Sequence, residues 1–303
     1  PEGSGGRRPE RRLVREETIF GYALLLPALI LFGTFAYYPI ARAFHISLLD
    51  WDGISKTPAF IGLDNYARAL GDPLFQKAFR QTVYYTVGIV PSTMVTGLFL
   101  AVLLNNRLKG RALFRTIYYL PNVAPTVAAS VIWKLILDGN WGLLNFALKK
   151  VGLPTPNWLF EPQWAMIAIV IMGVWANAGY QMVIFLAGLQ GIPDVYYEAA
   201  RIDGAGRWQL FRFVTLPLLS YTTFFVLITS VIGSFQVFGS IYILTNGGPM
   251  QSTVVMVFLI YQRAFKYFQM GYGSALAYIL FVIILMLTLF QFWVGRRLVY
   301  YEV

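Results

Sequence analysis

The sequence predicts an all-α protein that crosses a membrane several times, and three observations lead to this prediction. The 303 residues are 57% hydrophobic and only 13% charged, which leaves more apolar surface than a water-soluble core of this size can bury. Long runs contain no charged side chain, and a membrane helix needs about 20 mostly apolar residues. Lys and Arg are concentrated in the segments that flank alternate runs. The solvent for most of this chain is therefore lipid.

The first four uncharged runs predict the first four transmembrane helices. The first run follows a basic stretch, but it is longer than the apolar part of a signal peptide, about 7–15 residues. No small-x-small cleavage site follows it, so we expect a retained helix. The four runs are residues 18–41, 81–106, 116–133 and 162–193.

The fifth run, residues 213–262, is too long for one helix across a membrane. The segment Leu244-Thr-Asn-Gly-Gly-Pro-Met250 interrupts it with strong turn-forming residues, so we expect the fifth span to end near Leu244. Residues 252–268 are short and contain two basic side chains, which favours an external half-helix over another span. Residues 267–295 predict the sixth and last span.

Most of the basic residues lie on one side of these predicted spans, which orients the protein. By the positive-inside rule, the basic segments face the cytoplasm of a prokaryotic cell, and six spans then place both termini there. We expect a multi-pass protein of the inner membrane. The net charge of +10 follows from this asymmetry and does not indicate nucleic-acid binding. The basic segments are residues 1–17, 107–115, 201–212 and 296–297.

The residue types exclude several kinds of chemistry. No glycine precedes a lysine, so the chain has no phosphate-binding P-loop, and it has no cysteine for thiol chemistry. The only histidine, His45, has no acidic cluster beside it, which indicates a surface side chain rather than a metal ligand. The predicted spans hold no charged relay of the kind that ion-coupled transporters use. We expect a transport protein that is not an enzyme and takes its driving force from another subunit.

A polar loop between the fourth and fifth runs, residues 191–219, predicts a pair of short helices. Pro193 and Asp194 form a plausible helix start, with Asp194 capping free N–H groups. Gly204 suits the left-handed position that ends a helix. Residues 207–214 predict a second helix with an apolar stripe that contains Trp208 and Phe211, ended by Pro217.

Such short helices need a surface to pack against, because isolated helices persist only above about 12–15 residues. Small side chains at Ala199, Ala200 and Ala205 allow a partner to approach closely, and the charged side chains between them can orient it. An ordinary amphipathic loop that lies on lipid headgroups is the alternative interpretation.

The order of residues in this loop resembles the EAA loop of ABC importer permeases of the carbohydrate-uptake type. Glu198-Ala-Ala200, Asp203-Gly-Ala205 and Leu216-Pro217 follow one another as in that family. The resemblance covers about residues 20–300 and is closest to permeases similar to those for maltose and glycerol phosphate. Val214 replaces the usual isoleucine, and Ser220-Tyr221 stands where many relatives have a further proline. Other matching stretches are Tyr119-Leu-Pro121 with Pro125, Leu189-Gln-Gly-Ile-Pro193 and Tyr242-Ile-Leu-Thr-Asn-Gly-Gly-Pro249.

The resemblance implies a type I importer with several subunits. Its expected partners are a second, non-identical permease, a dimer of ATPase subunits and an external solute-binding protein, in a lipid bilayer. ATP and Mg would be bound by the ATPase, so we expect no cofactor, metal or catalytic residue in this chain. The resemblance implies that the EAA helix docks on the ATPase and couples ATP hydrolysis to transport. The coupling residues are Glu198, Ala199, Ala200, Asp203, Gly204 and Ala205.

Polar and aromatic residues at helical spacing predict the substrate pathway. Amides and hydroxyls can satisfy sugar hydroxyls, and aromatic faces can cover the apolar C–H surface of a sugar. The same residue types also join membrane helices without any ligand, which is the alternative for each position. The resemblance favours Asn122, Thr126 and Gln236. The predicted pathway residues are Asn122, Thr126, Asn177, Gln181, Ser234, Gln236, Phe238, Tyr242, Ser274 and Tyr278.

The resulting prediction is a six-span permease for a neutral mono- or oligosaccharide, because no basic side chain lies in the spans. A permease for glycerol 3-phosphate or another polyol or phosphodiester is the alternative within transport. A stand-alone channel, or a scaffold that moves no solute, is the alternative from another class. The expected parts are a cytoplasmic tail at 1–17, a permease domain at 18–298 that contains the loop 191–219, and a cytoplasmic tail at 299–303.

Overall fold

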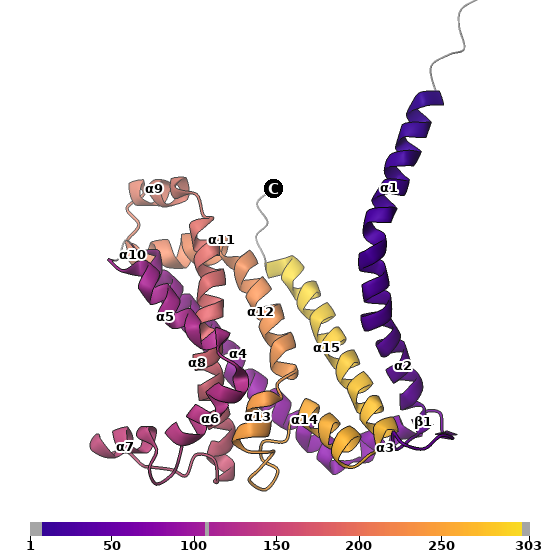
Figure 1. The fold of residues 1–303 in the computed structure, drawn as a ribbon. Helices are drawn as coiled ribbons and strands as arrows, with labels where there is room; N and C mark the ends of the chain where they lie inside the picture. The colour runs from indigo at the N-terminus through magenta and orange to yellow at the C-terminus, as the bar shows by residue number, and fades with distance from the viewer. Residues whose placement is uncertain (1–7, 107–108, 299–303) are drawn as a thin grey trace, which may run out of the picture.

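The computed structural model describes residues 8–106 and 109–298, and it is helical almost throughout (Figure 1). Within these residues, four helices are long and apolar enough to cross a membrane. A fifth span results if the two helices on either side of a 63° bend count as one. The all-α membrane class is confirmed at this level. The tails at 1–7 and 299–303 and the predicted loop residue Arg107 lie outside the described residues. The helices that qualify are Phe20–Ser47, Pro73–Asn105, Pro162–Gln190 and Met270–Arg297, with the bent pair Arg207–Leu218 and Ser220–Phe235.

The elements follow one another along the chain with short connections. Pairing between strands, as far as the structure describes the chain, is limited to a two-residue hairpin in which Leu49 lies opposite Phe60. In order, the elements are α1 (Arg8–Phe32), η1 (Gly33–Tyr37), α2 (Tyr38–Ser47), β1 (Leu49–Asp50), β2 (Ala59–Phe60), α3 (Asp64–Gly71), α4 (Pro73–Asn105), α5 (Arg111–Val123), α6 (Thr126–Ile136), α7 (Leu143–Lys150), α8 (Pro162–Gln190), α9 (Asp194–Ile202), α10 (Arg207–Gln209), η2 (Leu210–Thr215), α11 (Leu216–Leu218), α12 (Ser220–Phe235), α13 (Gly239–Leu244), α14 (Met256–Tyr261), η3 (Gln262–Lys266) and α15 (Met270–Leu298).

Helices α4 and α8 form the centre of the bundle, with α5 against α8 and α12 against α4. Glycine permits these close approaches, because a Cβ at Gly97 of α4 would lie only 2.8 Å from the Cβ of Gln181 on α8. At the α5 contact, a Cβ at Gly179 would overlap the carbonyl of Tyr118. The glycines therefore determine how closely the helices approach one another.

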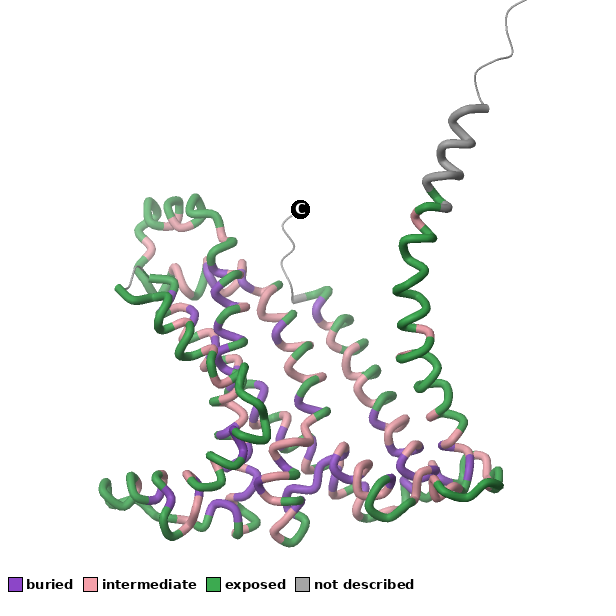
Figure 2. Tube along the Cα trace, viewed as in Figure 1, coloured by how far each residue is buried: buried purple, intermediate pink, exposed green. Residues whose placement is uncertain are grey.

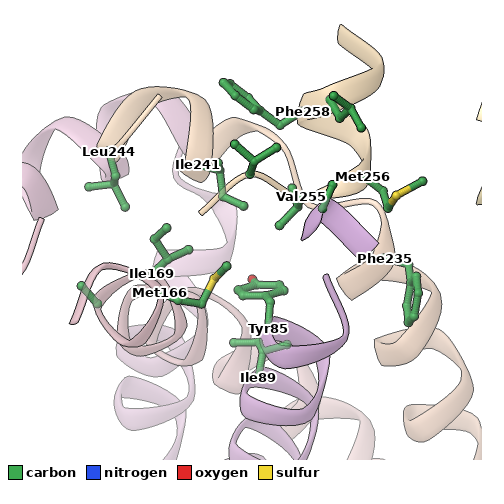
Figure 3. Packing of buried hydrophobic residues seen from close by; sticks show 14 of the residues in the cluster. Tyr85, Ile89, Met166, Ile169, Phe235, Ile241, Leu244, Val255, Met256 and Phe258 are labelled. Atoms are coloured by element: carbon green, nitrogen blue, oxygen red, sulfur yellow. The ribbon is translucent and has the colours of Figure 1, made fainter. Parts of the chain in front are cut away.

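Two clusters of buried apolar side chains hold the bundle together. The larger cluster joins the first part of α4 and of α8 to α13, α14 and α15, and Figure 3 shows Tyr85 and Ile89 of α4 facing Ile169 of α8 and Val255. The smaller cluster joins the far ends of α4 and α8 to the start of α12 through Leu104, Phe185 and neighbouring residues. Close packing gives each buried Leu, Ile, Met or Phe more van der Waals contacts than disordered lipid chains would provide. These contacts stabilise the bundle.

Helix α1 stands apart from the rest of the bundle (Figure 2). Exposed side chains cover its described part, and α2 returns to the bundle at α15, where the rings of Phe44 and Tyr278 lie 5.2 Å apart, and at α3, where the hydroxyls of Ser47 and Tyr66 lie 2.6 Å apart. A helix with apolar residues on every side and no packed neighbouring helix among the described residues needs lipid or another subunit around it.

Two predicted spans are interrupted in the structure. The third predicted span is two helices, α5 and α6, because Ala124 precedes Pro125 and takes an extended conformation. The fifth does not run unbroken to Leu244, since α12 ends at Phe235 and α13 begins at Gly239. The predicted external half-helix corresponds to α14 and η3. Helices α3 and α7 and the small hairpin lie in connections between the predicted spans.

The bundle has two distinct ends. Figure 1 shows the start of α1, helix α9 and the end of α15 at the upper end. The hairpin strand β1 lies at the lower end together with α3, α7 and α14. The two described ends of the chain and the predicted coupling loop therefore lie at the same end of the molecule.

Candidate functional site

A cavity of about 390 Å³ lies among α4, the α5–α6 break, α8, α12 and α13. It is located between the two apolar clusters, because Tyr85, Ile89 and Met172 of the larger cluster and Val226 of the smaller one line it. The lining side chains are apolar, hydroxyl, amide or aromatic, and within the described residues none of them is charged. Such a lining fits an uncharged ligand with many hydroxyl groups.

Gln181 of α8 connects three helices at this cavity. Its Nε2 donates to Thr93 Oγ1 of α4 at 3.0 Å and to Ser230 Oγ of α12 at 2.8 Å. Thr93 in turn donates to the carbonyl of Ile89 at 2.8 Å, so it accepts from Gln181. The side chain of Gln181 is buried, and its Oε1 has no hydrogen-bond partner among the described residues.

Other predicted pathway residues surround Gln181. Asn122, Thr126, Asn177, Ser234 and Phe238 all line the same cavity, although they come from four separate helices and a connecting segment. Asn177 donates to the carbonyl one turn earlier in α8, at 2.8 Å, and Ser234 pairs with Thr86 of α4 at 3.0 Å. Asn122 and Thr126 are exposed at the α5–α6 break. The amide of Asn122 and the hydroxyl of Thr126 can therefore donate and accept hydrogen bonds there.

Four predicted pathway residues lie outside the cavity lining. Gln236 is exposed where α12 ends, and Tyr242 belongs to an aromatic group on α13 and α14. Ser274 is half-buried on α15. The hydroxyl of Tyr278 donates to the carbonyl of Ile40, so this side chain joins α15 to α2.

Sequence reasoning missed several lining residues. Thr93, Thr229, Ser230 and Tyr180 line the cavity but were not among the predicted pathway residues. Ser230 precedes Ser234 by one helical turn, so the spacing rule used for α6 and α8 would have found it. Thr93 lies in an apolar stretch of the second run, and no local pattern distinguishes it from hydroxyls that only bond their own helix.

The loop between α8 and α12 forms a second candidate site, and α9 lies where the first short helix was predicted. Pro193, rather than Asp194, occupies the N-cap, and no side chain caps the free N–H groups there. At the other end, the N–H of Ala205 bonds to the carbonyl of Ala200 at 2.9 Å and that of Gly204 to Arg201 at 3.0 Å. This is a Schellman ending, and Gly204 takes the left-handed conformation with φ of 81°.

The second short helix is longer than predicted. It continues from α10 through the π-helix η2 into α11, past Pro217, which is the second residue of α11. The 63° bend then separates it from α12. The hydroxyls of Tyr197 and Thr215, 3.2 Å apart, tie α9 to η2.

The outer surface of this loop is strongly exposed. Ile202 is 86% exposed, and Trp208 and Phe213 are each 71% exposed. Four of the six predicted coupling residues, Glu198, Ala199, Asp203 and Gly204, are exposed, and Ala200 and Ala205 are half-buried. Large apolar side chains at this level of exposure, next to charged and small residues, are typical of a protein interface.

Comparisons with known proteins agree on one family. The family model described as "Binding-protein-dependent transport system inner membrane component" matches residues 93–300. The trehalose/maltose transport system permease protein of Thermococcus litoralis is 38% identical, over 94% of this chain and 96% of that protein. The sn-glycerol-3-phosphate transport system permease protein of Yersinia pestis is 34% identical, over 93% and 95%. A chain of a bacterial ABC transporter involved in the import of the acidic polysaccharide alginate has a TM-score of 0.81 at 25% identity, over 94% of this chain and 99% of that chain.

Proposed function

Because the chain belongs to the family of binding-protein-dependent transport system inner membrane components, we propose that it forms part of the pathway by which an ATP-driven importer moves a neutral sugar. It is the multi-pass permease of an ABC importer in the inner membrane, for sugars or glycerol 3-phosphate, and it is a transport component without catalytic activity of its own. ATP is hydrolysed by a separate ATPase, and a periplasmic binding protein delivers the solute.

The proposal that the substrate is a neutral sugar rests on the uncharged lining of the cavity. Glycerol 3-phosphate and other anionic solutes are normally held by the side chains of Arg or Lys, and the described lining contains neither. The lining instead offers amides and hydroxyls such as Asn122, Thr126 and Gln181 beside the rings of Phe238 and Tyr180. Amides and hydroxyls can bind the hydroxyls of a sugar, and rings can cover its C–H faces.

The arrangement of the bundle supports six spans. We count α5 with α6 as the third span and the bent pair with α13 as the fifth, so both termini face the cytoplasm, together with α9. Helix α9 and Gly204 then form the coupling element that docks on the ATPase, and its exposed apolar surface supports this role. A second, non-identical permease covers the exposed faces of α5 and α6 and completes the pathway.

The test is uptake into lipid vesicles that contain the chain with its second permease, ATPase and binding protein. We expect uptake of a neutral saccharide that requires ATP, and no uptake of glycerol 3-phosphate. Uptake without nucleotide would indicate a channel. The double variant Asn122→Ala with Thr126→Ala should lower saccharide uptake at least about tenfold, since two good polar contacts are each worth about 1 kcal/mol.

A matched control comes from α5. Thr116 is exposed, bonds only to the carbonyl of Ala112 one turn earlier, and does not line the cavity. Thr116→Ala should leave uptake unchanged. A complex that accumulates the anionic solute and ignores saccharides, or cavity variants that transport as well as the control, would contradict the proposed function.

A further inference from the structure

Four aromatic rings form a continuous series that begins in the cavity and leads away from it toward the end of the molecule opposite α9. We name this series, Phe238, Tyr242, Tyr261 and Phe265, the aromatic track. Phe238 lines the cavity and stacks on Tyr242, with ring centroids 5.4 Å apart and planes at 22°. Tyr261 lies 5.5 Å from Tyr242 and 5.1 Å from Phe238, so these three rings contact one another, and Phe265 extends the group at 5.9 Å from Tyr261. Each separation is within the range at which rings interact favourably.

Two rings of the track are exposed and two are half-buried. Tyr242 is 43% exposed and Phe265 is 60% exposed, whereas Phe238 and Tyr261 are half-buried. Phe258, which contacts Phe238 at 6.4 Å and Tyr242 at 6.5 Å, is instead fully buried in the larger apolar cluster. Figure 3 shows Phe258 among the core side chains. Phe258 therefore supports the track from beneath, while the track itself leaves ring surface open.

Contacts from other helices hold the track in place. The N–H of Met256, at the start of α14, donates to Thr82 Oγ1 of α4 at 3.0 Å, and Thr82 is fully buried. Near the start of η3, Arg263 pairs with Asp72 at 3.2 Å. Because the start of α14 and the start of η3 are both tied to residues of α4 or its N-cap, Tyr261 lies on a supported helix, and Phe265 follows Arg263 by two residues.

We propose that the aromatic track is a sugar-binding surface along which a saccharide approaches the cavity from the end opposite α9. The proposal rests on the function proposed above and adds residues of α14 and η3 to the substrate pathway. Flat rings bind the apolar C–H faces of pyranose units, and the hydroxyls of Tyr242 and Tyr261 offer donors and acceptors beside them. The three clustered rings beside the cavity and Phe265 beyond them can contact neighbouring units of an oligosaccharide without a single deep site.

The first test is steady-state uptake by the assembled complex, with maltose and maltotetraose as probes. Phe265→Ala and Tyr261→Ala should raise KM for maltotetraose roughly two- to tenfold, the factor that corresponds to one ring contact. The smaller maltose should be affected less, because it covers fewer rings. Tyr261→Phe and Phe265→Tyr, which keep the rings, should restore a KM near that of the wild type.

Phe290→Ala is the matched control, since Phe290 stacks on Trp293 of α15 at 6.1 Å and does not line the cavity. It should leave both KM values unchanged. An equal rise in KM for Phe290→Ala would overturn the proposal, as would unchanged KM values in both track variants. Loss of co-purification with the second permease at unchanged KM would assign the track to the interface between permeases instead.

A second readout separates this proposal from the proposed function. Saturation-transfer NMR on the detergent-solubilised complex detects saccharide protons that lie close to aromatic rings, whether or not transport occurs. We expect transfer to maltotetraose in the wild type and a clear loss of it in a Tyr261→Ala and Phe265→Ala double variant. Transfer that persists in the double variant would reject the track. A wild type that shows transfer but takes up no saccharide would contradict only the transport assignment.

Discussion

At the scale of single residues, Gln181 shows how one buried amide can serve both packing and transport. Its two donated hydrogen bonds join α8 to α4 and α12, while its Oε1 has no partner among the described residues. A buried carbonyl without a donor costs about 1–3 kcal/mol, and each ordinary hydrogen bond contributes about 0.5–1.5 kcal/mol. The side chain is therefore close to neutral for stability, and its position at the cavity explains its presence better.

This balance predicts the behaviour of Gln181→Met, a change that keeps the volume of the side chain. The free energy of unfolding in detergent, followed by the thermal midpoint, should change by no more than about 1 kcal/mol. The loss of two hydrogen bonds is offset by removal of the buried Oε1 that has no donor. Saccharide uptake should fall severalfold. Gln163→Met, on the exposed first turn of the same helix, serves as the control. Normal uptake together with a strongly lowered midpoint would make Gln181 a purely structural link.

Gly204 makes a second prediction at this scale. Its φ of 81° is unfavourable for residues with a Cβ, and a side chain there would meet no described atom within 4 Å. Gly204→Val should therefore leave the protein inserted in the membrane but weaken ATPase binding and uptake, by strain of about 1–3 kcal/mol and by bulk at the docking surface. Gly204→Asn, which tolerates this conformation, should retain more activity. Full uptake and ATPase association in Gly204→Val would exclude α9 as the coupling element.

Asp72 provides a prediction of pH dependence. Burial raises the pKa of this carboxyl, but hydrogen bonds from Tyr272 and the N–H of Leu74 and the charge of Arg263 outweigh burial, so its pKa is lowered from 3.8. A lowered pKa in the folded state means that the ionised group stabilises the protein above pH 3.8 and that this contribution is lost as the pH falls through the folded-state pKa. The stabilising effect should therefore be complete at neutral pH.

Asp72→Asn should lower stability by about 1–2 kcal/mol at pH 7, since the amide keeps the hydrogen-bond geometry but loses the charge. Thermal unfolding of wild type and variant from pH 7 to pH 3 should show curves that converge in acid. Lys266→Met changes another cation of η3, which makes no ion pair among the described residues, and it should leave the pH dependence as in the wild type. Parallel curves for wild type and Asp72→Asn would contradict this account.

At the scale of elements, short helices depend on groups supplied by distant parts of the chain. Helix α14 is only six residues long and is too short to persist alone. Thr82 accepts from its first N–H and donates to the carbonyl of Ala78 at 2.8 Å, so one buried hydroxyl anchors α14 to α4. Helix α9 likewise relies on its glycine ending and on the contact between Tyr197 and Thr215.

Thr82→Val should therefore release α14. The change leaves the N–H of Met256 without its acceptor, which should destabilise this region by about 1–2 kcal/mol and speed amide exchange over residues 256–266. Thr96→Val is a close control, because Thr96 lies on the same helix and donates to the carbonyl of Ser92 at 2.7 Å but is only half-buried. Equal exchange at 256–266 in both variants would show that α14 is held by its apolar contacts alone.

At the scale of the whole molecule, the two ends of the bundle differ in what they present. The end with α9 exposes Ile202 and Trp208 beside charged residues, whereas the opposite end presents the short helices α3, α7 and α14 and the open part of the aromatic track. An importer needs this asymmetry, since the ATPase and the binding protein approach from opposite sides of the membrane.

The absence of cysteine from the sequence permits a clean test of orientation. Ile202→Cys places a thiol on α9, and Trp141→Cys places one at the opposite end, at a residue that is 91% exposed. In spheroplasts, a membrane-impermeant maleimide should label Trp141→Cys at once and Ile202→Cys only after permeabilisation. The parent chain should take no label. Labelling of Ile202→Cys from outside would reverse the proposed topology and would remove the coupling role of α9.

Sequence reasoning located the long helices well, because their signal is local. Uncharged runs correspond to α4, α8 and α15, and the turn-forming segment after Leu244 ends α13. Gly204 was placed correctly in the left-handed position because helix endings depend on a few adjacent residues. The break at Ala124 before Pro125 also has a local cause, but composition could not show that the run would divide there.

The sequence by itself therefore determined that the chain lies in a lipid membrane, where its helices lie approximately, and which family it belongs to. Hydropathy and motif order are properties of consecutive residues. Only the tertiary structure decided which polar side chains meet. Gln181 reaches Thr93 across 88 positions of chain and Ser230 across 49, and the close approach of α4 and α8 at Gly97 makes these bonds possible. Tyr278, at helical spacing from Ser274, contacts α2 instead of the cavity. Distances between such side chains depend on how whole helices pack, and no local pattern contains that information.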